Sequence, residues 1–259
     1  MTTVALHHDI QGPPQAPALF LGHSLGTTSA LWDPQVDALA AEFRVVRFDL
    51  RGHGASPVPP GPYTMTELAG DVVALADVLG VERFGYVGLS IGGAVGLTLA
   101  LEHPRRVGSM VLCGTAPRFG DPATWHERAE KVAAEGTGPL LEPTEQRWFT
   151  RELRTARPKM VAAVMDMLTT TPREGYAGCC EANAGYDVTE RLPEVRTPTR
   201  VIAGTEDVTA GPETAHALTD GLPRADLILV EDAAHIVNLA APDLFNEAVR
   251  EHLQRTLRA

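Results

Sequence analysis

The chain has 259 residues, of which 44% are hydrophobic and 21% are charged, a composition that supports a packed core and excludes an intrinsically disordered protein. Its 33 acidic and 22 basic residues give a formal net charge of −11, which argues against binding to nucleic acid or to an anionic membrane surface. An anionic small-molecule substrate would therefore need a local arginine or lysine to hold it.

Along the chain, segments with the apolar pattern of a strand alternate with segments whose apolar residues recur with the period of a helix. The first strand-like segment, residues 4–10, is interrupted by two histidines and an aspartate, so we expect an edge strand that runs antiparallel to the others. Short apolar runs bounded by glycine or proline are typical of parallel strands that are buried on both faces, and we predict them at residues 18–24, 43–49, 83–90, 107–114, 199–205 and 225–232. Segments with helical period lie at residues 66–79, 91–102 and 243–257. This alternation predicts an α/β fold with a mostly parallel, twisted sheet flanked by helices.

The alternation is interrupted between residues 116 and 192, where no segment has a convincing strand pattern. The length of the chain suits one large domain or a core that carries an insertion. We therefore expect a two-part α/β core, residues 1–115 and 193–259, with residues 116–192 inserted as a helical cap before the last two strands. The helices predicted in this cap are residues 122–136, 143–155, 158–170 and 176–184.

A Gly-Leu-Ser-Ile-Gly segment at residues 88–92 follows a predicted strand and leads into a helix. Glycine two positions before and after Ser90 allows a tight turn that lifts the serine hydroxyl clear of the sheet. This position predicts that Ser90 is a nucleophile. The alternative is a glycine-rich turn that only lets the backbone pack closely, or an anion site at the start of a helix.

A serine hydroxyl near neutral pH needs a base to accept its proton and a third group to orient that base. His235 follows the last predicted strand, where it would reach over the turn at Ser90. Asp207 follows the strand before it. Because successive side chains leaving a strand point to opposite sides, only one of Asp207 and Glu206 can face His235. Asp232 is a third acid in the same region, and we interpret it as a solvated loop carboxylate. The chain order Ser90, Asp207, His235 is that of a hydrolase with a nucleophile turn.

A tetrahedral intermediate also needs hydrogen-bond donors for its oxyanion. We predict the backbone N–H of Ile91, which follows the nucleophile, and that of Leu25, in the loop after the strand at residues 18–24. His23 and His53 follow strands at the same edge of the sheet and are possible substrate contacts.

The three cysteines, Cys113, Cys179 and Cys180, are odd in number, and the adjacent pair is poorly placed for an unstrained disulfide. This favours a reducing compartment. The first residues lack a basic stretch followed by a long apolar run, and no window reaches about 18 uninterrupted apolar residues. We expect a cytoplasmic protein that acts on a small molecule, without a membrane span or a nucleic-acid partner.

Characteristic motifs cover nearly the whole chain: HSLGTT at 23–28, WDPQV at 32–36, DLRGHGASPVPPGPYT at 49–64, GLSIGG at 88–93, RWFT at 147–150, EGYAGCC at 174–180, AGTEDVTAGPE at 203–213 and DAAHIVN at 232–238. In these motifs the chain resembles the α/β-hydrolase family and, within it, looks like the 3-oxoadipate enol-lactonases of the β-ketoadipate pathway. The resemblance implies the α/β-hydrolase fold and hydrolysis of an enol-lactone with a carboxymethyl arm, without a metal or organic cofactor. It also implies a catalytic triad of Ser90, Asp207 and His235. By the same resemblance, Arg147 and Trp148 lie in the cap over the substrate, and Arg147 is a candidate for its carboxylate.

The chain departs from the enol-lactonase pattern near the site. It has His23 where these proteins usually have asparagine, residues 208–212 in place of a Thr-Pro-Pro-like stretch, and Val237 where the loop around the base usually has serine. The reaction class is unaffected by these differences, but the substrate stays open. A carboxylesterase or a carbon–carbon bond hydrolase acting on another small ester, lactone or diketone is the alternative, and a non-catalytic small-ligand receptor is a remote one.

Overall fold

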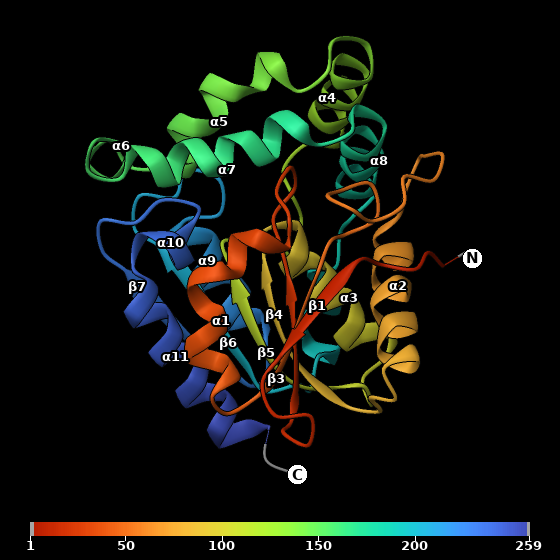
Figure 1. Ribbon diagram of the computed structural model, residues 1–259, viewed down its shortest axis with the longest axis vertical. Coiled ribbons are helices and arrows are strands. Elements are labelled where there is room, and N and C mark those ends of the chain that lie inside the picture. Colours follow the sequence, from red (N-terminus) through yellow and green to blue (C-terminus); the bar gives the residue numbers. More distant parts are fainter. Residues whose placement is uncertain (1–2, 258–259) are drawn as a thin grey trace.

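The computed structural model describes residues 3–257. Within these residues, seven strands form one sheet in the order β1-β3-β2-β4-β5-β6-β7, in which β1 is antiparallel to β3 and all other neighbouring strands are parallel (Figure 1). The strands are β1 (His8–Gln11), β2 (Ala18–Gly22), β3 (Arg44–Phe48), β4 (Phe84–Leu89), β5 (Val107–Cys113), β6 (Thr199–Gly204) and β7 (Ala225–Val230). The mostly parallel α/β fold predicted from the sequence is confirmed.

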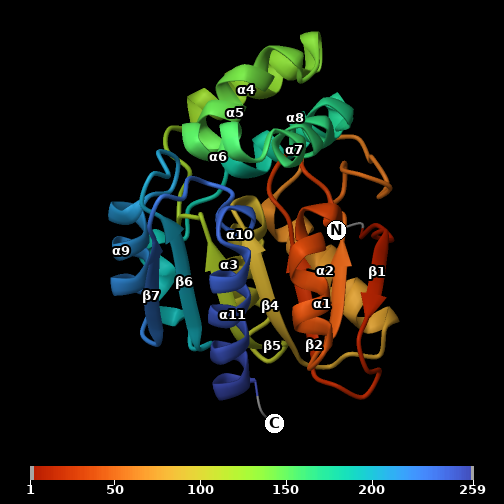
Figure 2. The same cartoon turned by 60° about the vertical axis from the view of Figure 1, so that its left-hand side comes forward.

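Helices cover both faces of this sheet. Helices α1 and α11 lie side by side over one face, and α2 and α3 pack together over the other (Figure 1 and Figure 2). The helices of these two layers are α1 (Asp33–Ala40), α2 (Met65–Val78), α3 (Ile91–Glu102), α9 (Pro212–Gly221), α10 (Val237–Ala240) and α11 (Pro242–Thr256), with the short 3₁₀ helices η1 (Ser29–Trp32) and η3 (Thr189–Glu194). Every residue of the central strands β4 and β5 is buried, as their uninterrupted apolar runs require.

Helices α4 to α8 form a separate layer above the carboxyl ends of the parallel strands (Figure 2). They are α4 (Pro122–Glu135), α5 (Leu141–Trp148), α6 (Arg151–Ala156), α7 (Pro158–Thr170) and α8 (Arg173–Ala184), with η2 (Gly138–Leu140). The chain enters and leaves this layer side by side, because Val188 donates from its N–H to the carbonyl of Pro117 at 2.9 Å and Arg118 forms a β-bridge with Asp187. We propose that the layer acts as a cap over the sheet edge.

Two element predictions need correction. The edge strand is His8–Gln11 rather than residues 4–10, because the N–H of Val4 donates instead to the side chain of Asp71 in α2, at 2.9 Å. The helix predicted at residues 143–155 is broken into α5 and α6. Phe149 is extended, with φ −132° and ψ 137°, and Thr150 then caps a new helix by accepting from the N–H of Leu153.

No helix among residues 3–257 has both the length and the apolar character needed to cross a lipid bilayer.

Candidate active site

Ser90 lies in a strained turn between β4 and α3. Its φ of 58° and ψ of −119° are rare for a residue with a side chain. The backbone approaches so closely here that a Cβ at Gly92 would overlap the carbonyl oxygen of Gly22. Two hydrogen bonds to strand β5 and its exit hold it: the Ser90 N–H donates to the Cys113 carbonyl at 2.9 Å, and the Thr115 hydroxyl donates to the Ser90 carbonyl at 2.8 Å. The surrounding structure thus maintains the strain and presents the hydroxyl at the sheet edge.

His235 and Asp207 form a buried pair at the same edge. The Nδ1 atom of His235 lies 2.9 Å from Oδ2 of Asp207, and the other carboxylate oxygen accepts from the N–H groups of Thr209 at 2.7 Å and Ala210 at 3.1 Å. Burial raises the pKa of Asp207, but His235 and these N–H donors outweigh it and hold the pKa below its ordinary value. The carboxylate is therefore ionised and fixed in orientation.

The neighbouring acids do not compete for this place. Glu206 and Asp232 are both exposed, whereas Asp207 is buried against His235. Glu206 and Asp207 both lie in the turn after β6, which ends at Gly204, and the Asp207 N–H donates back to the Gly204 carbonyl at 3.3 Å, so the turn and not strand alternation separates the two side chains. Of the three acids considered from the sequence, the structure brings only Asp207 to His235.

Gly114 is a site residue that the sequence reasoning missed. It follows β5 with a φ of +47°, and a Cβ added there would lie 3.2 Å from Nδ1 of His235 and 3.4 Å from Oδ2 of Asp207. A side chain at this position would crowd the His–Asp pair. A glycine directly after a buried strand, at the same edge as the other candidates, is the signal that was available.

A cavity of about 250 Å³ connects the serine and the histidine. It is lined by Ser24, Leu25, Ser90, Trp125, Arg128, Thr144, Arg147, Trp148, Tyr176, Val208, Thr209 and His235. Among the hydrogen bonds of residues 3–257, none joins the Ser90 hydroxyl to His235, a common situation in sites without substrate. The same bonds include none from the N–H of Leu25 or Ile91, which are free to meet an oxyanion. This arrangement can support nucleophilic attack on a small carbonyl compound.

Arg147 and Trp148, at the end of α5, both line this cavity. The Trp148 ring stacks on His235 with centroids 6.5 Å apart and planes at 24°, and its carbonyl accepts from the N–H of Ile236 at 3.2 Å. The helical layer therefore contacts the loop that carries His235. Sequence reasoning missed the four other residues that the helical layer contributes to the cavity wall, Trp125, Arg128, Thr144 and Tyr176, and three from loops at the sheet edge, Ser24, Val208 and Thr209.

His23 and His53 are not in the cavity wall, so the prediction that they contact the substrate is wrong. Both are fully buried. His23 accepts from the N–H of Leu50 at 2.9 Å through Nε2, and its Nδ1 lies 2.8 Å from the carbonyl of Ser24. His53 accepts from the N–H of Gly26 at 3.0 Å. Both rings therefore brace the backbone of the loop that carries Leu25.

These buried rings predict that stability falls in mild acid. Burial lowers the pKa of His23, and burial with the charge of His23 lowers that of His53 to about 3, although the Asp49 carboxylate opposes both shifts. In the unfolded chain these two histidines bind their protons near pH 6.5, whereas in the folded chain they bind them only at lower pH. The free energy of unfolding should therefore be intact above pH 6.5 and fall below it, by up to about 1.4 kcal/mol per pH unit for each histidine. Urea unfolding at pH 7, 6 and 5 measures this fall.

The matched variants for this prediction are His53→Gln and His216→Gln. Glutamine at 53 keeps an acceptor for Gly26 but cannot titrate, so the pH slope should become shallower. His216 is exposed, and its variant should keep the slope of the unmodified chain. Equal slopes in all three proteins would contradict a role for His53.

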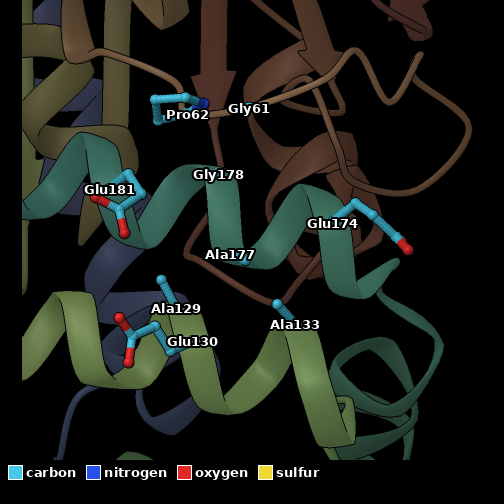
Figure 3. A pocket seen from close by; sticks show the side chains of 9 residues that line it. All are labelled: Gly61, Pro62, Ala129, Glu130, Ala133, Glu174, Ala177, Gly178 and Glu181. Atoms are coloured by element: carbon cyan, nitrogen blue, oxygen red, sulfur yellow. The ribbon is translucent and has the colours of Figure 1, made fainter.

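A larger hollow of about 480 Å³ lies elsewhere in the helical layer, between α4, α8 and the loop at Gly61 and Pro62 (Figure 3). Small residues and three glutamates line it: Ala129, Ala133, Ala177, Gly178, Glu130, Glu174 and Glu181. None of the predicted catalytic residues reaches it. Helices α4 and α8 thus turn glutamates towards this hollow and Arg128 and Tyr176 towards the cavity at Ser90.

The comparisons agree with a hydrolase over most of the chain. The family described as the alpha/beta hydrolase fold matches residues 17–242. The 3-oxoadipate enol-lactonase 2 of Acinetobacter baylyi is 35% identical over 252 residues, which cover 97% of this chain and 94% of that protein. The crystal structure of the enol-lactonase from Burkholderia xenovorans LB400 has a TM-score of 0.94 and 40% identity, covering 97% of both chains. A malate-bound thermophilic esterase from Thermogutta terrifontis has a TM-score of 0.93 and 29% identity, covering 97% of this chain and 94% of its own.

Proposed function

Because this chain belongs to the α/β-hydrolase family, we propose that it is a serine hydrolase that opens 3-oxoadipate enol-lactone to give 3-oxoadipate. This reaction is a step of the β-ketoadipate pathway of aromatic catabolism, and we place it in the cytoplasm. The placement of Ser90 and His235 in the wall of one small cavity, with Asp207 behind His235, is the observation that carries the proposal. A cavity of about 250 Å³ is below the usual range for drug-sized ligands, which is about 300–1,000 Å³, and suits a small lactone.

In the first half of the reaction, the Ser90 hydroxyl attacks the lactone carbonyl while Nε2 of His235 accepts its proton. Asp207 accepts a hydrogen bond from Nδ1–H, which keeps Nε2 free as the base. The N–H groups of Leu25 and Ile91 donate to the oxyanion. The bond from the carbonyl carbon to the ring oxygen then breaks, and His235 returns the proton to the enol oxygen. The enol relaxes to a ketone, so it leaves more readily than an alkoxide.

In the second half, water hydrolyses the ester formed on Ser90. His235 accepts a proton from the water as its oxygen attacks the acyl carbon, and then returns that proton to the serine oxygen. The product carries a new carboxylate at the serine in addition to the one on the lactone arm. Arg147, in the wall of the same cavity, provides positive charge for the arm.

A carboxylesterase that acts on small esters is the second candidate, favoured by the likeness to the Thermogutta terrifontis esterase. Both candidates use the same three residues, so the substrate alone distinguishes them.

The test is product identification by mass spectrometry after incubation with 3-oxoadipate enol-lactone and, separately, with a panel of neutral p-nitrophenyl esters. The proposal expects 3-oxoadipate as product and a higher kcat/KM for the lactone than for any ester. Faster turnover of the neutral esters would establish the esterase instead. Failure to turn over either class, with no labelling of Ser90 by a serine-directed phosphonate, would indicate a non-catalytic receptor.

A further inference from the structure

Two guanidinium groups face the cavity from different helices of the layer above the sheet, Arg128 from α4 and Arg147 from α5. Neither has a carboxylate within ion-pair distance anywhere in residues 3–257. This is unusual in a chain of net charge −11, where carboxylates are plentiful. An arginine pair left without acids in a concave site is a feature expected of anion binding.

Both side chains are held in place by neutral groups. The Arg128 guanidinium lies over the Trp125 ring, 4.7 Å from its centroid, and its positive charge opposes the rise that burial causes in the pKa of the Tyr176 hydroxyl. The Nη2 atom of Arg147 donates to Oγ1 of Thr144 at 3.2 Å. These contacts orient the planar groups but occupy few of the five N–H donors of each. The remaining donors are available to a ligand.

The two like charges also affect one another. Burial and the charge of Arg128 lower the pKa of Arg147, so the groups are near enough to repel. Glu130 of α4 and the α8 residues Glu174 and Glu181 line the other hollow (Figure 3) and do not neutralise them. An anion between the arginines would relieve this repulsion and be fixed by several charge-assisted hydrogen bonds.

We propose that Arg128 is a specificity-determining residue that, together with Arg147, binds a free carboxylate on the acyl part of the substrate. The inference rests on the proposed hydrolysis at Ser90 and deepens it: the site selects lactones and esters whose acyl chain ends in a carboxylate. Because hydrolysis creates a second carboxylate at the serine end, a linear six-carbon dicarboxylate such as adipate should also bind and inhibit.

The kinetic test compares two esters with five-carbon acyl chains, p-nitrophenyl hydrogen glutarate, which is anionic, and p-nitrophenyl valerate, which is neutral. In Arg128→Gln, kcat/KM for the anionic ester should fall by about 10–100-fold, mainly through KM, as expected for loss of hydrogen bonds to a charged group. The neutral ester should change by less than about threefold, as loss of charge alone predicts. Arg128→Lys should restore part of the loss, because it keeps the charge without the planar fork.

Arg151→Gln is the matched control, since Arg151 is an exposed cation of the same layer that does not line the cavity. It should leave the preference for the anionic ester intact. An equal loss for both esters in the Arg128 variants would overturn the inference and make Arg128 a structural residue.

Calorimetric titration of adipate into the Ser90→Ala variant separates this inference from the proposed function, because binding is measured without turnover. Adding Arg128→Gln to that variant should weaken adipate binding by about 10–100-fold. Unchanged adipate binding would refute the inference even if the lactone is the substrate. If Arg128→Gln weakens adipate binding but the unmodified protein does not hydrolyse the lactone, the proposed function is refuted and the carboxylate site is retained.

Discussion

Replacement of Ser90 by alanine is expected to lower kcat for the lactone by about 10⁶-fold, the scale of loss when a serine hydrolase is deprived of its nucleophile. Alanine keeps the Cβ and the backbone bonds that hold the turn, including the N–H bond to Cys113 and the bond from Thr115. The positive φ of residue 90 is as strained for alanine as for serine. The fold should therefore persist while the covalent step is lost. Steady-state kinetics, with circular dichroism to verify folding, measure both.

Ser24→Ala is the matched control for this prediction, because it removes a second hydroxyl from the same cavity. It should lower kcat by less than about tenfold, since a side chain with no catalytic role contributes only packing and solvation. A serine-directed phosphonate should label the unmodified protein and Ser24→Ala, but not Ser90→Ala. Turnover by Ser90→Ala at the rate of the unmodified protein would exclude the acyl-enzyme mechanism.

The core of the fold could be predicted from the sequence because its strands are buried on both faces. The run at residues 107–114, for example, contains no charge, and the structure buries all of β5. The helices α1, α9 and α10 were missed. Each has ten residues or fewer, and the clearest local signals, Pro34 at the start of α1 and Pro212 at the start of α9, mark where a helix begins but not how far it extends.

The positions of Ser90, Asp207 and His235 were predictable for a topological reason. Each follows a parallel strand, and the carboxyl ends of parallel strands meet at one edge of a sheet. Residues far apart in sequence therefore arrive together without any knowledge of side-chain packing.

Residues from the helical layer could not be predicted in this way. Arg128 and Glu130 are two positions apart on α4, yet one faces the cavity at Ser90 and the other faces the second hollow. Which face turns inward depends on how α4 packs against α8, and the sequence pattern of one helix does not contain that information. The prediction that His23 contacts the substrate failed for another reason. Its place after β2 is that of a site residue, but both of its ring nitrogens lie within hydrogen-bond distance of backbone groups.

Replacement of Asp207 by asparagine is expected to lower kcat by about 10⁴-fold while leaving the site assembled, the effect of a wrong histidine tautomer in such a triad. One oxygen of Asp207 accepts from the N–H groups of Thr209 and Ala210, so the asparagine oxygen must take that side. The amide NH₂ then points at Nδ1 of His235, which becomes an acceptor, and the proton of the ring moves to Nε2. A protonated Nε2 cannot accept the proton of Ser90.

Glu206→Gln removes the neighbouring exposed carboxylate and should change kcat by less than about threefold, as expected of a surface substitution. Steady-state kinetics of both variants measure the difference. A large loss of kcat in Glu206→Gln with little loss in Asp207→Asn would show that Glu206, and not Asp207, is the acid that orients His235.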